Sequence, residues 1–494
     1  MPRRESRGRG ELDPSLGRWV MAGSVLGSGT VFLESTVVTV ALPAIAREFH
    51  LGVAGLQWVL NGYLLPLGAL MLLGGALGDR FRRSTVFASG LAGFAIASLC
   101  CAIAPTPGTL LAARVAQGTA GALLVPNSLA MIETTFEGEA RGAAIGHWAG
   151  WSGISTALGP LLGGWLVQVA SWRWVFASVA PFAIASAWIV WRRASGADSS
   201  SAALASSGER APIDYAGAVL ATLGLAGVVA ALILGPGGVA PRALVAAAAV
   251  GGVACLGAFI VVEHGAPAPL LPLEVFRSRQ FTGANVTTLL VYAALGGLFF
   301  LLMLELQNVL GYGPLAAGAS LLPINFLMLA LSPVVGRRAQ HTGPRVPMTF
   351  GALIASVGML LFTRVRPGAS YASAVLPAVT VFGLGLAILV APLTAAVLGA
   401  VDERLAGVAS GVNNAVARLA GLLATAALPL LAGFGGLAEP RGPALSEGFA
   451  RAMLIGAALC AAGAVVAWVT VSRAAAVTPV MHPSPQQGCV QRGR

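Results

Sequence analysis

Four ionisable side chains lie inside long apolar stretches of the chain, where a charge needs a partner or a proton. They are Glu34, Arg114, Glu305 and Arg418. A charged side chain that faces lipid at the bilayer centre costs roughly 2.5–3.5 kcal/mol, so each of these should face a cavity or a polar partner. A carboxyl group in such a place can bind and release a proton. The residue types and their surroundings therefore predict the handling of protons or cations within an apolar phase.

Glu34 is the first candidate proton carrier, and Arg114 must have an acceptor or a water-filled cavity because arginine stays charged. A carboxylate does not comfortably hold a proton and a cationic substrate together, and this competition would make their exchange obligatory. Two plainer interpretations stay open. Glu34 could be protonated and serve packing alone, and Arg114 could be a structural tie to backbone carbonyl groups.

Two further groups of polar residues are candidates for a substrate or proton site. Glu305 and Gln307 lie in the outer part of one apolar stretch, and Asn413, Asn414 and Arg418 lie in another. Glu305 could simply be exposed to water, and Arg418 could extend to the membrane surface or pair with another group. The sequence leaves these alternatives open.

The composition places nearly the whole chain in a membrane. Hydrophobic residues make up 56% and charged residues only 10% of its 494 residues, whereas roughly a quarter of the residues in soluble domains are charged. Apolar windows of about 20 residues, the length that spans a bilayer as a helix, predict an all-α integral membrane protein with fourteen transmembrane helices. The windows lie near 19–43, 55–77, 85–104, 108–132, 142–168, 173–191, 215–235, 243–262, 282–307, 314–336, 346–363, 371–399, 405–432 and 449–471.

The arginines indicate how these spans are oriented. The chain contains no lysine, and if both termini are cytoplasmic, 21 of its 30 basic residues fall in cytoplasmic segments and seven fall outside. This is the positive-inside pattern. We therefore expect a multi-pass protein of the cytoplasmic (inner) membrane with both termini in the cytoplasm. The net charge of +11 then needs no nucleic acid partner.

The expected domain organisation follows from a linker and an internal repeat. Residues 192–213, rich in Ser, Ala and Gly, separate an N-terminal six-helix bundle, 1–191, from the rest. The loop from Gly75 to Arg83 resembles that from Gly336 to Arg345, and such repeats on one side of the membrane imply two pseudo-symmetric bundles around a central site. The other predicted parts are two inserted transmembrane helices in 214–263, a cytoplasmic loop in 264–280, a C-terminal six-helix bundle in 281–473 and a cytoplasmic tail in 474–494.

Several short motifs follow one another along the N-terminal spans. They are Glu34-Ser-Thr-Val-Val-Thr-Val-Ala-Leu-Pro43, Leu56-Gln-Trp-Val59, Gly75-Ala-Leu-Gly-Asp-Arg-Phe-Arg-Arg83, Arg114-Val-Ala-Gln-Gly118, Gly159-Pro-Leu-Leu-Gly-Gly164 and Trp172-Arg-Trp-Val-Phe176. Together they resemble the fourteen-helix drug:proton antiporters of the major facilitator superfamily, a multidrug efflux type, over nearly the whole chain. Glu34 stands where the family usually has Asp, and Arg82 where it usually has Gly.

This resemblance implies roles for the matching residues. Glu34 and Arg114 would couple transport to protons, with the arginine responding to protonation of a nearby carboxylate, and Trp58 and Tyr63 would line the substrate site. A cytoplasmic gate, pairing the two bundles in one state, would be formed by Asp79, Arg80 and Arg83; the alternative is an ordinary solvated loop. A kinked, closely packed helix would be built on Gly159, Pro160, Gly163 and Gly164.

The function predicted is secondary active transport rather than enzymatic catalysis. We expect a proton-coupled antiporter that exports small amphipathic or cationic drugs or antibiotics by alternating access, driven by the proton gradient. No cofactor or metal is expected, because the sequence has no P-loop, no H-E-x-x-H or G-x-S-x-G motif and no metal-ligand cluster. The expected partners are the substrate and membrane lipid; no protein partner can be named. A dedicated exporter of one endogenous metabolite or antibiotic is the nearest alternative, and a membrane enzyme or receptor is the alternative from another class.

Overall fold

The structure is a computed structural model that describes residues 14–194, 213–238, 240–267, 269–402, 405–434 and 442–473. These residues form helices and connecting turns, and none of them forms a β-strand. Helices suit the bilayer core, where no water can pair with the backbone, because a helix satisfies its backbone hydrogen bonds within the segment. The predicted fold class, an all-α membrane protein, is confirmed.

The N-terminal half contains α1 (Pro14–Phe49), α2 (Val53–Ala69), α3 (Met71–Arg80), α4 (Arg83–Ala102), α5 (Pro107–Ala122), α6 (Leu124–Thr135), α7 (Gly138–Val169), α8 (Arg173–Ala177) and α9 (Ala180–Ile189), followed by the π-helical turn η1 (Val190–Ala194). The next two helices are α11 (Tyr215–Leu234) and α12 (Arg242–Gly265). The C-terminal half contains η4 (Leu273–Arg277), α13 (Arg279–Asn308), α14 (Pro314–Ala319), α15 (Leu322–Thr342), α16 (Arg345–Phe362), η5 (Tyr371–Val375), α17 (Leu376–Leu398), α18 (Ala406–Leu431) and α19 (Gly442–Thr470).

Fourteen predicted spans are consistent with these helices. Among the described residues, 12 helical segments are long and apolar enough to cross a membrane, and 13 if α2 and α3, bent by 42°, count as one. The remaining predicted window is filled by α7, whose 32 residues extend about 48 Å at 1.5 Å per residue. Its glycines and polar residues lower its hydropathy, although its length suffices for a span.

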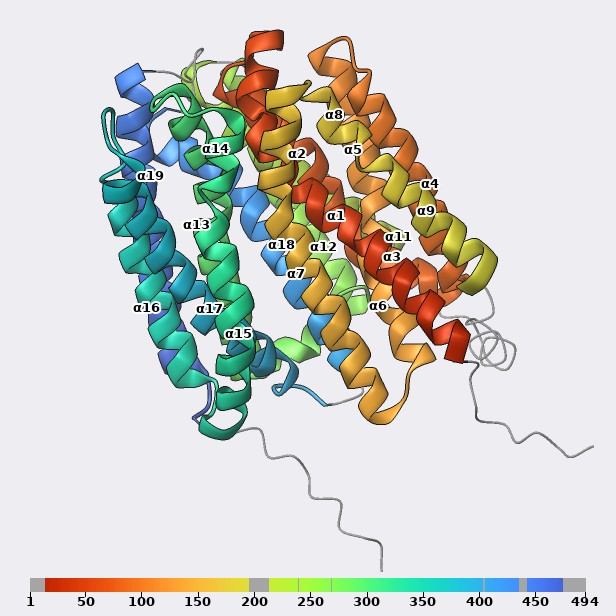
Figure 1. Ribbon diagram of the computed structural model, residues 1–494. Coiled ribbons are helices and arrows are strands. Elements are labelled where there is room, and N and C mark those ends of the chain that lie inside the picture. The colour runs from red at the N-terminus through yellow and green to blue at the C-terminus, as the bar shows by residue number, and fades with distance from the viewer. Residues whose placement is uncertain are drawn as a thin grey trace, which may run out of the picture.

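The helices gather into two groups that stand side by side (Figure 1). Helices α1 to α9 pack with one another, α13 to α19 form the second group, and α11 and α12 pair with each other while α11 contacts α2 and α18. We call these groups the N-bundle, the C-bundle and the inserted hairpin. The first turn of α1 and the last turn of α19 lie at the same end of the molecule, which we call the terminal end (Figure 1).

The two bundles are joined at the end opposite to the terminal end. One hydrophobic core runs from the second half of α1, at Val37 and Leu42, into the C-bundle, whereas Val20 and Val31 belong to a separate core within the N-bundle. Polar contacts cross the same half: Gln307 Nε2 donates to Val40 O at 3.0 Å. The extensive shared core therefore lies in this half, while α18 of the C-bundle also contacts α2 and α3 of the N-bundle.

Glycines allow α7 to lie directly against α14 in this joined half. A Cβ at Gly164 would collide with the carbonyl oxygen of Pro314, and a Cβ at Gly318 would collide with that of Pro160. The contact is reciprocal, because each helix places a glycine on the proline carbonyl of the other. Towards the terminal end, by contrast, the glycines of α7 do not lie against a neighbouring helix. A Cβ would meet no atom within 4 Å at Gly142, Gly146, Gly150 or Gly153.

Close packing of α5 against α2 positions the central polar residues, and it depends on Gly118. A Cβ at this position would collide with the Tyr63 carbonyl oxygen and would lie 2.7 Å from Pro66 Cγ. We expect Gly118→Ala to destabilise the protein by about 1–3 kcal/mol, as overpacking of a well-packed core does. Thermal unfolding in detergent measures this. Gly108→Ala is the matched control on α5, since a Cβ there meets nothing within 4 Å, and equal melting temperatures for the two variants would contradict the prediction.

Candidate functional site

A buried ion pair joins α1 to α5 in the middle of the N-bundle. The Arg114 guanidinium donates from Nη1 to Glu34 Oε1 at 2.6 Å. The two side chains are 1% and 0% exposed. Removing two opposite charges from water is expensive, and attraction in the apolar interior offsets the cost only if further hydrogen bonds hold the groups. The sequence offered these two residues as isolated ionisable groups; the structure makes them partners.

Several groups hold the Arg114 side chain in place. Its Nε donates to Val59 O at 3.1 Å, and Nη1 also donates to Gln117 Oε1 at 2.7 Å. The amide of Gln117 in turn donates to Ser98 Oγ at 2.7 Å. The guanidinium carbon lies 4.4 Å from the centroid of the Tyr63 ring, a cation–π contact. Arg114 thus keeps acceptors of its own even when its attraction to the carboxylate changes.

One carboxylate oxygen of Glu34, Oε2, is buried and makes no hydrogen bond to the described residues. A buried carboxylate oxygen without a donor costs free energy, and a proton or a cation would remove that cost. The arrangement can therefore bind a proton at Glu34 and transmit the change of charge to Arg114, which is the chemistry that its residue types predict.

The two aromatic candidates lie in different places. Tyr63 is buried beneath the guanidinium of Arg114, and its hydroxyl donates to Val31 O at 3.3 Å. Trp58 packs instead with Val229 and Leu422, in the seam between α2, α11 and α18. The structure thus brings Tyr63 to the ion pair and places Trp58 against the inserted hairpin.

Glu305 is fully buried, so the alternative that it is simply exposed to water is wrong. Its Oε1 accepts a hydrogen bond from Ser446 Oγ at 2.7 Å, and its Oε2 has no partner among the described residues. The side chain lies between α13 and α19, inside the C-bundle. Gln307 turns the other way and crosses to α1 at Val40. Because successive residues on a helix face different directions, these neighbours serve different contacts.

Arg418 bridges the bundles close to the ion pair. Its Nη1 donates to Ser35 Oγ at 3.1 Å, and its guanidinium carbon lies 5.1 Å from the centroid of the Phe32 ring. Among the described residues no carboxylate lies within ion-pair distance of it. Arg418 is therefore a partly buried positive charge with a neutral partner. Its partner Ser35 is the residue after Glu34 on α1, so Arg418 lies close to the buried ion pair.

The two asparagines before Arg418 do not reach that region. Asn413 Nδ2 donates to Thr288 Oγ1 at 2.8 Å and to Asn285 Oδ1 at 3.1 Å, which ties α18 to α13. Asn414 Nδ2 donates to Ser410 O on its own helix at 3.1 Å. In this conformation both asparagines make contacts within the C-bundle.

The loop between α3 and α4 makes its ion pair within the N-bundle. Asp79 Oδ1 and Arg83 Nη2 are 2.6 Å apart, and Arg83 Nη1 donates to Ala130 O at 3.1 Å. Arg80 is exposed. Arg404, which precedes α18, lies outside the described residues. Whether these side chains pair the bundles in another state stays a prediction.

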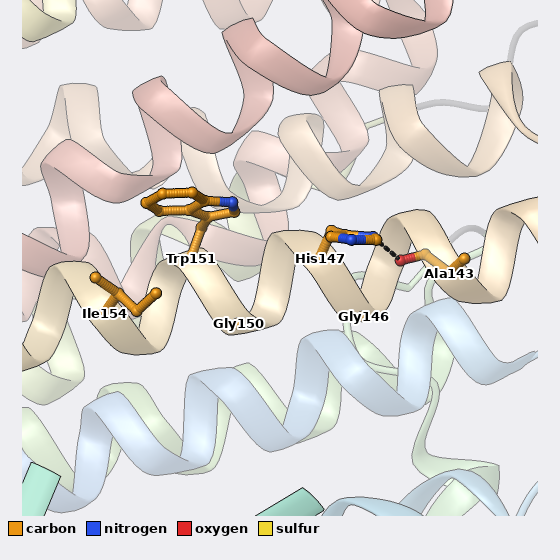
Figure 2. Close-up of a pocket in the computed structure, with 6 residues that line it drawn as sticks. All are labelled: Ala143, Gly146, His147, Gly150, Trp151 and Ile154. Atoms are coloured by element: carbon orange, nitrogen blue, oxygen red, sulfur yellow. Dashed lines mark hydrogen bonds between the residues drawn. The ribbon is translucent and has the colours of Figure 1, made fainter. Parts of the chain in front are cut away.

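A groove of about 450 Å³ follows the half of α7 that carries the open glycines. It is lined by Ala143, Gly146, His147, Gly150, Trp151 and Ile154. The side chains of His147 and Trp151 project from one face of the helix (Figure 2), and His147 Nδ1–H donates to Ala143 O at 2.9 Å. The groove is shallow and open, because all its lining residues belong to α7, and its surface is mainly apolar.

Three polar residues at the centre were not among the predicted site residues: Gln117, Ser98 and Ser35. A signal for Gln117 was present, because it stands three residues after Arg114 and so shares a helix face with it. Ser35 had no such signal. Its contact with Arg418 joins positions 383 residues apart in sequence.

Two helical bundles that pack side by side in an apolar chain, one of them holding a buried ion pair, are the architecture of helical membrane transporters. Comparison with known proteins identifies the family: residues 25–425 match the model of the Major Facilitator Superfamily, and the chain belongs to it. It is 34% identical over 413 residues to the tetracenomycin C resistance and export protein of Streptomyces glaucescens (82% of this chain, 74% of the relative). It is 35% identical over 402 residues to a puromycin resistance protein of Streptomyces alboniger (81% and 78%).

Solved structures show the same fold. A bacterial homologue of the human lysosomal transporter Spinster, inward-facing and unoccupied, aligns with a TM-score of 0.63 at 18% identity and covers 93% of this chain and 98% of its own. An auto-inhibited peptide transporter of the POT family aligns with a TM-score of 0.64 at 15% identity, over 92% and 96%. The family membership and these relatives make the chain a transporter and not an enzyme, as predicted.

Proposed function

We propose that the protein exports small amphipathic compounds, of the drug or antibiotic kind, in exchange for protons. Relatives whose names state export of tetracenomycin C, resistance to puromycin and multidrug resistance support the direction and the cargo. The proton gradient drives the cycle, and no cofactor takes part. The observation that carries the proposal is the buried Glu34 carboxyl, which pairs with Arg114 through one oxygen and keeps the other without a partner.

In the proposed cycle a proton on Glu34 neutralises the carboxylate and weakens its attraction to Arg114. The guanidinium keeps Val59 O and Gln117 Oε1 as acceptors. Protonation of Glu34 therefore shifts the Arg114 side chain without removing all its hydrogen bonds. A ligand changes a conformational equilibrium by its different affinity for the two states. Here the proton is that ligand, and it favours one orientation of α1 relative to α5.

The terminal end is the cytoplasmic side in this proposal, as the distribution of the arginines favours. The conformation described above is then inward-open: the bundles are joined on the outer side, and the groove on α7 faces the cytoplasm or the inner leaflet. Cargo enters along this groove near Trp151. Asp79, Arg80 and Arg83 close the inner side when the bundles rock to the outward-open state.

The test is uptake of ethidium into energised inverted vesicles that contain the protein. We expect uptake that collapses with a proton uncoupler and that falls to background in Glu34→Gln, because glutamine cannot exchange a proton. Glu447→Gln is the matched control, since Glu447 is 71% exposed and, among the described residues, pairs with Arg451 on its own helix at 3.4 Å. Uptake that persists with uncoupler, or a Glu34→Gln variant as active as the control, would refute proton coupling through Glu34.

The unpaired charge of Arg418 favours a second candidate, a dedicated exporter of one metabolite that carries an acidic group. A guanidinium with a single neutral partner has donors left for bidentate recognition of a carboxylate. Fluorescein and rhodamine 123 share a ring system and differ in charge, so they separate the two candidates. Uptake of fluorescein alone, lost in Arg418→Gln, supports the acidic-cargo exporter; uptake of ethidium and rhodamine 123 supports the broad one.

A further inference from the structure

Two acidic side chains that the proposed transport cycle does not use lie together at one end of the inserted hairpin. Asp214 immediately precedes α11, and Glu263 lies near the end of α12. Helices α11 and α12 pack along each other, and the contacts of Gly217 with Glu263 and of Gly227 with Gly252 make the pair antiparallel. The start of α11 therefore adjoins the end of α12. Glu263 is only 3% exposed.

Each carboxylate uses one oxygen and leaves the other without a partner. Asp214 Oδ1 accepts from the backbone N–H of Gly217 at 2.8 Å, which caps α11. Glu263 Oε2 accepts from the backbone N–H of Leu271 at 3.3 Å. Asp214 Oδ2 and Glu263 Oε1 are both buried, and neither has a hydrogen-bond partner within the part of the chain that the structure describes. Unpaired buried carboxylate oxygens are costly, so something is expected to satisfy them.

The two unpaired oxygens border the same space, next to the Cα of Gly217. A Cβ on Gly217 would collide with Asp214 Oδ2 and would lie 3.3 Å from Glu263 Oε1. Glycine therefore lets both carboxylates approach the same point on α11. The positive N-terminal end of α11 offsets part of their repulsion, because a helix dipole acts there as roughly half a charge. It does not balance two full negative charges.

The geometry points to a binding site for a divalent metal cation, Mg²⁺, held by Asp214 and Glu263. Carboxylate oxygens are the donors that Mg²⁺ prefers, and it is commonly bound through one or two carboxylates while it keeps several waters. The described residues contain no group of three or more His, Cys, Asp or Glu side chains that could form a full cage. That absence disfavours zinc, whose structural sites use four protein ligands, and suits a partly hydrated Mg²⁺.

A cation at this position would fasten the inserted hairpin to the chain that follows it. Glu263 already holds the Leu271 amide, and the segment after Leu271 leads through η4 into α13 of the C-bundle. Metal binding would lock the two carboxylates and the turn at Leu271 into one unit. The site would thus stabilise the junction between the hairpin and the C-bundle, independently of transport chemistry at Glu34.

The experiment is thermal unfolding of the purified full-length protein in detergent with increasing MgCl₂, compared with KCl at equal ionic strength. We expect a saturable rise of a few degrees in Tm with MgCl₂ alone, because a ligand that binds only the folded state stabilises it. Hydrogen exchange supplies a local readout. MgCl₂ should slow exchange of peptides that contain the amides of Gly217 and Leu271, and leave peptides of the N-bundle unchanged.

Three variants make the test specific. Asp214→Asn and Glu263→Gln keep the hydrogen-bond acceptors but remove the charges, and each should lose the response to MgCl₂. Gly217→Ala should also lose it, because the added Cβ displaces the Asp214 carboxylate. Glu447→Gln, whose side chain is exposed, should respond as the wild type does. A wild-type Tm and exchange pattern that ignore MgCl₂ and change only with pH would overturn the proposal, since two carboxylates sharing a proton would behave in that way.

Discussion

Arg114→Gln is expected to destabilise the protein by about 3–5 kcal/mol, which is the cost of leaving a buried charge without its partner. Glu34 is fully buried and pairs with Arg114 at 2.6 Å, so the substitution leaves a carboxylate with no counter-charge. The loss should shrink at acid pH, because a protonated Glu34 carries no unpaired charge. Thermal unfolding in detergent across a pH series measures this, and uncoupler-sensitive ethidium uptake in vesicles should be abolished.

The double variant Glu34→Gln, Arg114→Gln separates stability from function. Two amides can hydrogen-bond to each other without any charge, so most of the lost stability should return. Transport should not return, because the proposed proton carrier, Glu34, is absent. A double variant that is as unstable as Arg114→Gln would show that the arginine stabilises through Val59, Gln117 and Tyr63 rather than through Glu34. Recovery of uncoupler-sensitive transport in the double variant would contradict the coupling role itself.

Gly164→Val is expected to shift the protein towards the conformation that is open at the end opposite to the terminal end. A Cβ at Gly164 would collide with Pro314 O and would lie 2.8 Å from Leu315 Cα. This clash exists only while α7 and α14 are in contact. Overpacking costs about 1–3 kcal/mol, and the same free energy applied to a conformational equilibrium changes it by roughly 5–150-fold. Transport should fall by about tenfold or more, since the cycle needs both states.

Cross-linking tests this shift directly. Gln168 Oε1 accepts from the backbone N–H of Leu315 at 3.2 Å, so cysteines placed at these two positions should cross-link while the joined half is closed. Gly164→Val should lower the yield. Gly153→Val on the same helix is the control, because a Cβ at Gly153 meets nothing within 4 Å. Loss of transport with an unchanged cross-link would mean that the substitution damages α7 locally and does not move the equilibrium.

The sequence by itself determined the membrane class, the positions of the spans and the ionisable residues that matter. These are local properties: a run of about 20 apolar residues has one stable form in lipid, whatever its neighbours are. An arginine or a glutamate inside such a run must be satisfied, so Glu34 and Arg114 could be selected without any coordinates. The motifs around them carried the family resemblance for the same reason, since they occupy a few consecutive residues on one helix.

Only the tertiary structure decided which groups meet. The ion pair joins residues 80 positions apart, and the Arg418–Ser35 contact joins residues 383 apart. Both depend on how each helix is rotated about its axis, which the packing of glycines and apolar side chains sets over the whole bundle. The same packing buried Glu305 beside Ser446, where its position along the span had left exposure to water open. Hydrophobic length is encoded residue by residue, whereas partnership between polar side chains is a property of the assembled helices.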